Sequence, residues 1–282
     1  MPGTSHAVLI TGCSSGIGHA TALRLVNDGW TVYATARRPE TLSELQQAGC
    51  RTLALDVCDE ASMQAAVRAV TETEGAVGVL INNAGYSQSG AVESVPLPDV
   101  RRQFETNVFG LVALTQLVLP GMRAQRFGKV VNLSSMGGRL TFPGGGLYHA
   151  TKYAVEAISD ALRFEVRGFG VDVILIEPGL IVTRFGETAA GSVAQAAGEP
   201  GPYAEFNASV AKLTAGAYTG PMAKLGGPPE RVADVIVKAL KAKKPRARYP
   251  VTPSARLLIN QRRMMPDGAW DRVMRSQFPT PH

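Results

Sequence analysis

The chain has 282 residues, a hydrophobic content of 45%, a charged content of 18% and a net charge of +6. This composition is typical of a soluble globular domain and excludes the disordered and fibrous classes. The longest apolar stretch, residues 108–122, is too short to span a bilayer, and we expect no signal peptide before the first strand. Cys13, Cys50 and Cys58 show no paired or CxxC spacing, so we expect reduced thiols and a cytoplasmic protein.

The positive charge is concentrated near the C-terminus. Residues 238–282 contain eleven Lys or Arg and two Asp, a balance of +9, so the rest of the chain sums to −3. Such a tail can bind an anionic membrane surface or nucleic acid, or it can be a solvated or subunit-contacting extension. No nucleic-acid-binding module accompanies it, so we expect no nucleic-acid partner and no stable membrane insertion.

Short apolar runs alternate with helical patterns along the first two thirds of the chain. Six buried strands are expected, at residues 7–11, 31–36, 51–55, 77–81, 129–133 and 171–176. Apolar residues at helical spacing fill the intervals, most clearly at 60–72, 100–124 and 148–168. Because each interval is long enough for a crossover, the pattern predicts one α/β domain with a doubly wound, Rossmann-type parallel sheet and helices on both faces.

This alternation stops after residue 183. Residues 184–228 are rich in Ala, Gly and Pro without a sustained period, which favours an irregular substrate lid. A helix is expected again at 229–242, and residues 246–249 fit a seventh strand.

The tail pattern indicates one further helical element. Trp270, Val273, Met274 and Phe278 fall on one helical face, which favours packing over chemistry. We therefore expect a domain over residues 1–250 and a basic helical extension over 251–282 packed on it.

Gly12, Gly16 and Gly18 form a GxxxGxG loop directly after the first expected strand. Glycine permits the tight turn and lets backbone N–H groups approach a pyrophosphate at the positive end of the following helix. Alone, this spacing also fits a simple turn, but its place between a strand and a helix favours a dinucleotide site.

Several motifs together resemble one family. Residues 11–18 (TGCSSGIG) are similar to the TGxxxGIG motif of the short-chain dehydrogenase/reductase family. The other matches follow in the family's order: Asn82-Asn83-Ala84-Gly85, Asn107, Ser135 thirteen residues before Tyr148, Tyr148-xxx-Lys152, and Pro178-Gly179 with Thr183. The resemblance covers residues 5–183 closely and 229–250 loosely, and it implies an NAD(P)-dependent oxidoreductase acting on CH–OH groups.

Tyr148 and Lys152 lie four residues apart, on one face of an expected helix. Many YxxxK pairs are surface packing, but this one opens a helix beside the expected cofactor crevice. A free tyrosine has a pKa of about 10, and an ammonium about 4 Å away contributes on the order of 4 kcal/mol at an effective dielectric constant of ~20. That energy corresponds to roughly three pKa units, so we expect Tyr148 to be the general acid/base.

The resemblance implies roles for further residues. Ser135 would stabilise negative charge on the substrate oxygen, with Ser134 as its rival, and Lys152 would bind the nicotinamide ribose. Asn107 would hold a water of a proton relay, and its amide could also satisfy the backbone of a kinked helix. The cofactor contacts implied are Gly12, Ser14, Ser15, Gly16, Ile17, Gly18, Asp56, Val57, Asn83, Ala84, Gly85, Tyr148, Lys152, Pro178, Gly179, Ile181 and Thr183. No metal site is expected.

The end of the second strand indicates the form of the cofactor. NAD-selective relatives place a carboxylate there, whereas this chain has Ala36, Arg37 and Arg38. Arg37 can donate charge-assisted hydrogen bonds to a 2′-phosphate, and Arg38 either assists or is solvated. Ser15 stands where many NADP-dependent members have a basic residue, yet NADP(H) is favoured over NAD(H).

We expect hydride transfer between NADP(H) and an alcohol or ketone. The alternative is a catalytically silent NADP(H)-binding regulatory protein, but such proteins usually lose the Tyr or the Lys. Family members commonly pair through two long helices, here 100–124 and 148–168, so a homodimer or homotetramer is expected.

The substrate is expected to be bulky and apolar. Leu140, Phe142, Gly144–Gly146 and Leu147 lie between Ser135 and Tyr148, and they carry no charge. The lid adds Phe185, Tyr203, Phe206, Tyr218 and Met222, although these side chains could simply pack it onto the body. The length of the lid resembles the retinol- and hydroxysteroid-dehydrogenase branch.

Overall fold

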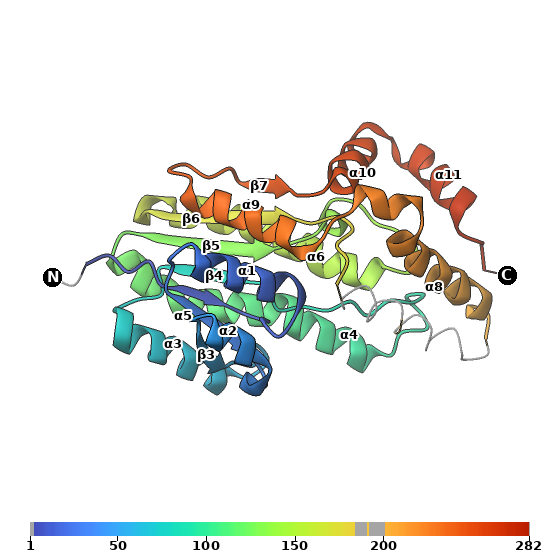
Figure 1. The fold of residues 1–282 in the computed structure, drawn as a ribbon. Helices are drawn as coiled ribbons and strands as arrows, with labels where there is room; N and C mark the ends of the chain where they lie inside the picture. Colours follow the sequence, from blue (N-terminus) through green and yellow to red (C-terminus); the bar gives the residue numbers. More distant parts are fainter. Residues whose placement is uncertain (1–2, 184–190, 192–200, 282) are drawn as a thin grey trace.

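A computed structural model describes residues 3–183, 191 and 201–281 (Figure 1). The strands are β1 (Val8–Ile10), β2 (Val32–Ala36), β3 (Arg51–Ala54), β4 (Val79–Asn82), β5 (Gly128–Leu133), β6 (Val171–Glu177) and β7 (Arg248–Pro250). The α-helices are α1 (Gly16–Asn27), α2 (Ser43–Gln47), α3 (Glu60–Glu74), α4 (Leu97–Phe104), α5 (Gly110–Ala124), α6 (Gly146–Val166), α8 (Ala204–Thr219), α9 (Pro229–Lys241), α10 (Pro253–Met264) and α11 (Asp267–Gln277). Short 3₁₀ turns are η1 (Pro39–Leu42), η3 (Met136–Gly138), η4 (Arg167–Phe169) and η5 (Pro221–Leu225).

The described strands form one sheet in the order β3-β2-β1-β4-β5-β6-β7, and every pair is parallel. This confirms the predicted doubly wound sheet, including the seventh strand that the sequence left open. The chain first builds outward from β1 to β3 and then crosses back to β4 on the other side of β1. The connections that follow β1 and β4 therefore lead to helices on opposite faces of the sheet, and parallel sheets of this kind bind ligands at such a point.

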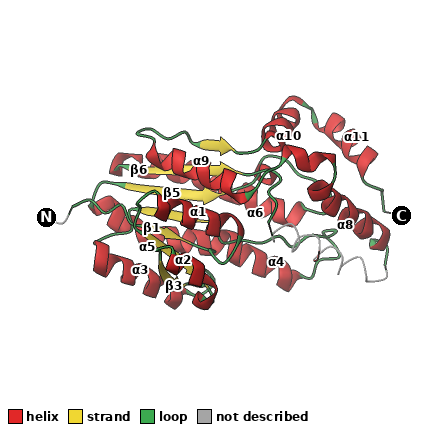
Figure 2. Cartoon of the chain, viewed as in Figure 1, coloured by secondary structure: helices red, strands yellow, loops and turns green. Residues whose placement is uncertain are grey.

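Two layers of helices cover the sheet, as Figure 2 shows. One core cluster joins the sheet to α1, α2 and α9, and the other joins its opposite face to α3, α5 and α6. Along β1 the side chains alternate, because Val8 and Ile10 belong to the first cluster and Leu9 to the second. A strand buried on both faces is apolar throughout, and this explains the unbroken hydrophobic runs of the sequence.

The helix predicted over 100–124 begins earlier and is interrupted. It starts at Leu97, and a π-helical turn, η2 (Glu105–Phe109), separates α4 from α5. Asn107 lies inside this turn, so the sequence expectation of an irregular helix at this residue is confirmed. A π turn inserts one extra residue and is frequent at functional sites.

Helices α8, α10 and α11 lie beyond the carboxyl ends of the strands, whereas α9 and β7 belong to the body of the sheet domain (Figure 1). The segment predicted to be irregular contains α8 and η5 within its described part. Ala-rich α8 has good helix propensity. Only Asn207 and Val210 of its described side chains are buried, so its sequence lacks the apolar stripe that predicts an amphipathic helix. Within the described residues, no helix has the length and hydrophobicity to cross a membrane.

The tail packs onto the body through a small apolar cluster. Trp270 and Met274 of α11 are buried against Leu140, and Trp270 Nε1 donates a hydrogen bond to the Thr141 carbonyl oxygen at 3.3 Å. The Arg262 guanidinium of α10 lies 5.7 Å from the centre of the Trp270 ring. The α10–α11 pair is thereby held against the segment that follows β5.

Candidate functional site

A cleft of about 2080 Å³ runs along the carboxyl ends of the strands. Its walls come from the loops after β1, β4, β5 and β6, from the start of α6, and from α8, η5, α10 and α11. The predicted site residues that line it are Gly12, Ser14, Ser15, Gly16, Ile17, Arg37, Asp56, Val57, Asn83, Ala84, Gly85, Ser135, Tyr148, Lys152, Pro178, Gly179, Ile181 and Thr183. Gly18 and Asn107 do not line the cleft. Gly18 packs against Gly12, and Asn107 is hydrogen-bonded to Tyr86, and both of these neighbours line it.

The glycine loop fits tightly at the start of α1. Gly12 and Gly16 have φ angles of +72° and +61°, which side chains rarely adopt. A Cβ atom on Gly18 would collide with the Gly12 carbonyl oxygen. Ser15, the N-cap of α1, makes no side-chain capping hydrogen bond, and the first turn has no acidic residue. The backbone N–H groups at this positive helix end therefore suit the pyrophosphate of a dinucleotide.

The loop after β4 is fastened to the glycine loop. Asn83 Nδ2 donates to the carbonyl oxygens of Thr11 and Gly12, at 2.8 and 3.0 Å. Thr11 Oγ1 accepts hydrogen bonds from the backbone N–H groups of Asn83 and Ala84, both at 3.0 Å. The Asn83 side chain thus has a structural task, and it sets the width of the cleft between β1 and β4.

Asn107 connects the π turn to two other parts of the site. Its Nδ2 donates to the Tyr86 carbonyl oxygen at 2.9 Å and to Thr151 Oγ1 on α6 at 3.2 Å. Its Oδ1 accepts from the Tyr86 backbone N–H at 3.1 Å. A Cβ atom on Gly85 would lie 3.1 Å from this oxygen, so only glycine fits without displacement. These hydrogen bonds join the π turn to the loop after β4 and to α6, and they do not decide between a structural and a water-holding role for the amide.

Ser135, Tyr148 and Lys152 border the same part of the cleft. Lys152 is buried, and its Nζ donates to the Leu133 carbonyl oxygen at 2.8 Å and lies 5.8 Å from the centre of the Tyr148 ring. Burial lowers the pKa of Lys152 to about 8, while the Glu156 carboxylate opposes the shift. An ammonium placed beside a phenol favours the phenolate form, which is the arrangement an acid/base tyrosine needs.

Both serines after β5 line the cleft. Ser135 Oγ accepts a hydrogen bond from the Gly137 backbone N–H at 3.0 Å, which leaves its own proton able to point into the cleft. Ser134 Oγ is buried and has no hydrogen-bond partner among the described residues. The geometry is consistent with Ser135 as the donor to a substrate oxygen, and it keeps Ser134 as the neighbouring alternative.

His149 is a lining residue that the sequence did not single out. It is buried, and desolvation lowers its pKa to about 4, so the imidazole is neutral near pH 7. Its Nδ1 accepts from the Phe142 backbone N–H at 3.3 Å, and Gly137 and Gly145 pack closely on the ring. His149 therefore holds the segment between Ser135 and Tyr148 in place. It belongs to no sequence motif, so the sequence alone does not predict this role.

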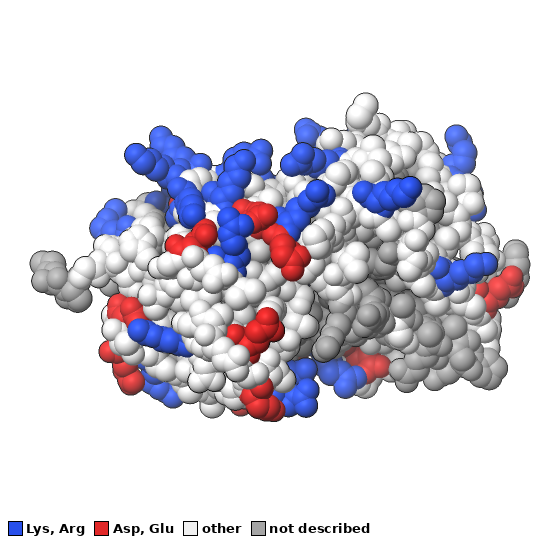
Figure 3. Space-filling model, in the orientation of Figure 1, with Lys and Arg blue, Asp and Glu red and all other residues white. Residues whose placement is uncertain are grey.

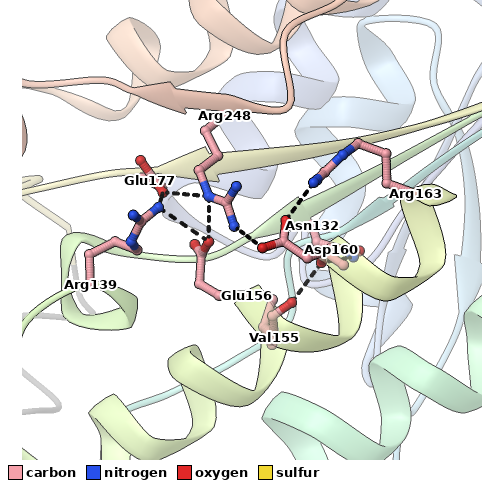
Figure 4. A network of polar contacts seen from close by, with 9 residues as sticks. Asn132, Arg139, Val155, Glu156, Asp160, Arg163, Glu177 and Arg248 are labelled. Carbon is pink, nitrogen blue, oxygen red and sulfur yellow. Dashed lines mark hydrogen bonds and ion pairs between the residues drawn. The ribbon is translucent and has the colours of Figure 1, made fainter.

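An ion-pair cluster behind the cleft joins four elements (Figure 4). Arg248 of β7 donates to Glu156 of α6 at 2.9 Å and to Asp160 at 2.6 Å. It also lies 3.4 Å from Glu177 of β6, which accepts a hydrogen bond from Arg139 at 3.3 Å. Glu156 is one turn beyond Lys152, Arg139 follows η3, and Glu177 directly precedes Pro178. The cluster therefore fixes three lining segments relative to one another.

The end of the cleft away from the glycine loop is mostly apolar. Its walls include Phe142, Val210, Leu213, Met222, Leu258, Trp270, Val273 and Phe278. Of the residues predicted to form the lid surface, Met222 lines the cleft and Tyr203 and Phe206 do not. Tyr203 instead donates a hydrogen bond to Glu93 at 2.7 Å. Phe185 lies outside the described residues, as does the side chain of Tyr218.

The apolar wall therefore comes largely from the tail. The prediction that Trp270 and Val273 of α11 are packing residues is confirmed, because Trp270 is 6% exposed and Val273 packs in the same apolar cluster. Both residues also line the cleft. The helical spacing of apolar residues predicts burial, but it does not predict that the same residues border a binding site.

Comparison with known proteins places this geometry in a family. A family sequence model described as short chain dehydrogenase matches residues 6–192. Over 270 residues the chain is 35% identical to an Escherichia coli protein named uncharacterized oxidoreductase YbbO, covering 95% of this chain and 93% of that one. Among solved structures, a short-chain dehydrogenase from Streptomyces avermitilis has a TM-score of 0.79 at 34% identity, covering 96% and 98% of the two chains.

Two relatives carry more specific names. The chain is 35% identical over 274 residues to the NADPH-dependent 3-dehydrocapnine reductase of Ornithobacterium rhinotracheale, covering 94% of each chain. It is 34% identical over 270 residues to the 3-ketodihydrosphingosine reductase of Bacteroides thetaiotaomicron, covering 95% of this chain and 96% of that one.

Glu177 gives a prediction for stability against pH. Burial, together with the nearby Glu156 carboxylate, raises the pKa of Glu177 from 4.5 to about 7, despite Arg139 and Arg248. The folded state then holds a proton that the unfolded chain releases, so this residue stabilises the fold below pH 4.5 and loses that contribution as the pH rises through about 7. Glu177→Gln removes the titrating proton, so its unfolding free energy should decline less across this window, by up to about 3 kcal/mol.

Urea denaturation at several pH values measures this difference. Glu165→Gln, at an exposed position of helix α6, is the control and should keep the wild-type dependence. Parallel curves for wild type and Glu177→Gln would contradict the assignment.

Proposed function

Because the chain belongs to the short-chain dehydrogenase family and is an oxidoreductase, we propose that it transfers a hydride between NADP(H) and a bulky apolar alcohol or ketone. One observation carries the proposal: the glycine loop, Ser135, Tyr148, Lys152 and a long apolar wall border one cleft. A nicotinamide cofactor follows from the family, whereas its phosphorylated form and the substrate are inferred from residues of this cleft.

The residues of the cleft divide the chemistry. When bound, the cofactor supplies or accepts the hydride. Tyr148 gives a proton to the substrate oxygen or takes it, and Ser135 donates a hydrogen bond to the same oxygen as its charge develops. Lys152 holds the ribose hydroxyls and favours the phenolate form of Tyr148 by its charge. We assign to Asn107 the positioning of a water behind Lys152.

The cofactor is held along the glycine loop and the ends of β2 to β6. Asp56 and Val57 border the adenine, Asn83 and Gly85 the adenosine ribose, and Ile181 and Thr183 the nicotinamide carboxamide. The remaining contacts come from Gly12, Ser14, Ser15, Gly16, Ile17, Ala84, Pro178 and Gly179, with Gly18 allowing close approach of the loop. All of these except Gly18 line the cleft, which supports the assignment.

The preference for NADP(H) rests on Arg37. Ala36 at the end of β2 places no carboxylate there, and Arg37 is exposed and lines the cleft. Arg38 is exposed as well but does not line the cleft, which favours Arg37 as the phosphate ligand. The NADPH dependence in the name of one relative agrees with this choice.

The substrate is inferred from the apolar wall. Apolar pockets with few polar groups select large hydrophobic ligands, and Arg139, the charged residue between Ser135 and Tyr148, is engaged by Glu177. The long-chain ketone in the name of one relative is of this kind. We therefore favour a long-chain, retinoid or steroid carbonyl compound over sugars, hydroxy acids and acyl thioesters. Residues 251–282, packed on a domain formed by 1–250, would supply much of the wall.

Assembly and location are part of the same proposal. Phe109, at the end of η2, and Tyr153 and Phe164 of α6 are exposed. Exposed aromatic side chains on paired helices suit a subunit interface, so we propose a homodimer or homotetramer. We also place the protein in the cytoplasm, because Cys13, Cys50 and Cys58 are free thiols.

The first prediction concerns the proton donor. Tyr148→Phe removes the transferable proton and keeps the ring, so NADPH should bind nearly as tightly as before. Turnover of any active ketone should fall at least about a hundredfold. Steady-state rates, paired with NADPH titration by fluorescence, measure both quantities. A variant that keeps most of its turnover would refute the role of Tyr148.

The second prediction concerns cofactor choice. Arg37→Asp replaces attraction to the 2′-phosphate by repulsion, so the affinity for NADPH should fall about tenfold to a hundredfold while NADH binding holds or improves. Arg38→Asp, one residue away and outside the cleft lining, is the control with little change expected. Equal affinities of the wild type for NADPH and NADH would be incompatible with this argument.

The third prediction concerns chain length. Each methylene buried in the cleft contributes about 0.8 kcal/mol, so kcat/KM should rise up to about fourfold per carbon in a series of ketones until the wall is covered. Sugars and acyl thioesters should be poor substrates. The proposal fails if kcat/KM is flat along the series or highest for the polar compounds.

A further inference from the structure

Exposed large apolar side chains gather at two places on the described surface. One group, formed by Leu97 of α4, Phe109 of η2, and Tyr153 and Phe164 of α6, fits the subunit interface proposed above. The other surrounds the mouth of the cleft: Leu213 of α8 is 41% exposed, Met222 of η5 38%, Leu257 of α10 55% and Met264 of α10 84%. Leu213, Met222 and Leu257 also line the cleft. The apolar interior of the site thus continues onto the surface.

The outer face of α10 has an unusual composition for a solvated helix. Its exposed residues include Arg256, Leu257, Asn260, Arg263 and Met264, which fall on one side at helical spacing. The helix contains no acidic residue. Two exposed arginines beside two exposed apolar side chains form a cationic, amphipathic face, whereas a solvated helix usually exposes polar side chains only.

Further cations stand around the same mouth. Lys212, beside Leu213, and Lys224, near Met222, are exposed, and η5 contacts α10. Arg272 and Arg275 are exposed on α11, with Asp271 as a nearby exposed acid, while Asp267 is paired with Arg262. Figure 3 shows Lys and Arg side chains around uncharged surface where α10 and α11 lie, with no acidic side chain there in this view.

We propose that this rim (Lys212, Leu213, Met222, Lys224, Arg256, Leu257, Arg263 and Met264) docks the cleft mouth onto an anionic lipid bilayer. The cations attract the negative headgroups, and the apolar side chains enter the interface between headgroups and acyl chains. An apolar substrate could then pass from the leaflet into the cleft without crossing water. This last step rests on the proposed function, whereas docking does not.

Charge alone does not select this surface. A larger basic patch, formed by Lys238, Lys241, Lys243, Lys244 and Arg246, lies at the end of α9 and before β7. No large apolar side chain of that segment is exposed, and Lys241 is paired with Asp28. The α9 patch therefore serves as the matched control: it carries the charge without the apolar side chains and lies away from the cleft lining.

The test is co-sedimentation of the full chain with vesicles of phosphatidylcholine, with and without added phosphatidylserine. We expect binding only with phosphatidylserine, weakened by high NaCl. Each cation contributes about 1 kcal/mol near such a surface, so Arg256→Glu with Arg263→Glu should lower the partition coefficient more than tenfold. Met264→Ser should also weaken binding, whereas Lys243→Glu with Lys244→Glu should change it less than threefold.

Activity and assembly separate the alternatives. Turnover of a short, water-soluble ketone should be unchanged in the rim variants, and turnover of a ketone embedded in vesicles should fall with their binding. Equal binding to both vesicle types, or loss of binding only in the α9 variant, would overturn the proposal. So would a change in oligomeric state in the rim variants, because the rim would then be a contact between copies. Absence of ketone turnover in the wild type would refute the proposed function and leave the vesicle result to decide docking.

Discussion

All described strands of the sheet run in the same direction, and the site depends on this constraint. Because parallel strands end at one edge, residues far apart in the chain, such as Gly12, Asn83, Ser135 and Pro178, come together there. The crossover from β3 back to β4 opens a crevice beside β1. Hydrogen bonds from Asn83 to the first loop then fix its width, so the place for a dinucleotide follows from the topology and one amide.

Two groups of residues, the first an ion-pair cluster and the second an apolar wall, distinguish this site within the common fold. The Arg139–Glu156–Glu177–Arg248 cluster holds the segments after β5 and β6 against α6, so the groups around Lys152 do not move independently. Outside it, α8, α10 and α11 add an apolar wall whose rim reaches the surface. In the function that we propose, the first group orients the reacting side chains and the second selects the substrate. A basic, amphipathic rim on an apolar cleft is consistent with substrates that reside in membranes.

The sequence predicts the sheet and the cofactor loop well, because apolar runs and glycine spacing are local signals. It also predicts that Tyr148 and Lys152 share a helix face. It does not predict the ion-pair cluster, whose members lie on four elements and pair only after folding, nor His149, which has no motif. The sequence does not predict helix α8, because a helix on the rim of a cleft needs no apolar stripe. The tail residues that line the cleft, such as Trp270 and Val273, have the apolar helical spacing of ordinary packing residues, so the sequence does not identify them as part of the site.

The central claim is that the cofactor loop and the wall formed by α8, α10 and α11 belong to one active site. Hydrogen–deuterium exchange on the protein alone, with NADP⁺, and with NADP⁺ plus a long-chain ketone tests it, since this pair cannot react. NADP⁺ should protect residues 12–18 and 83–85, and the ketone should extend protection to 136–145, 204–225 and 253–277. If the ketone protects the segment around Ser135 while α8, α10 and α11 exchange as before, the wall is not part of the substrate site.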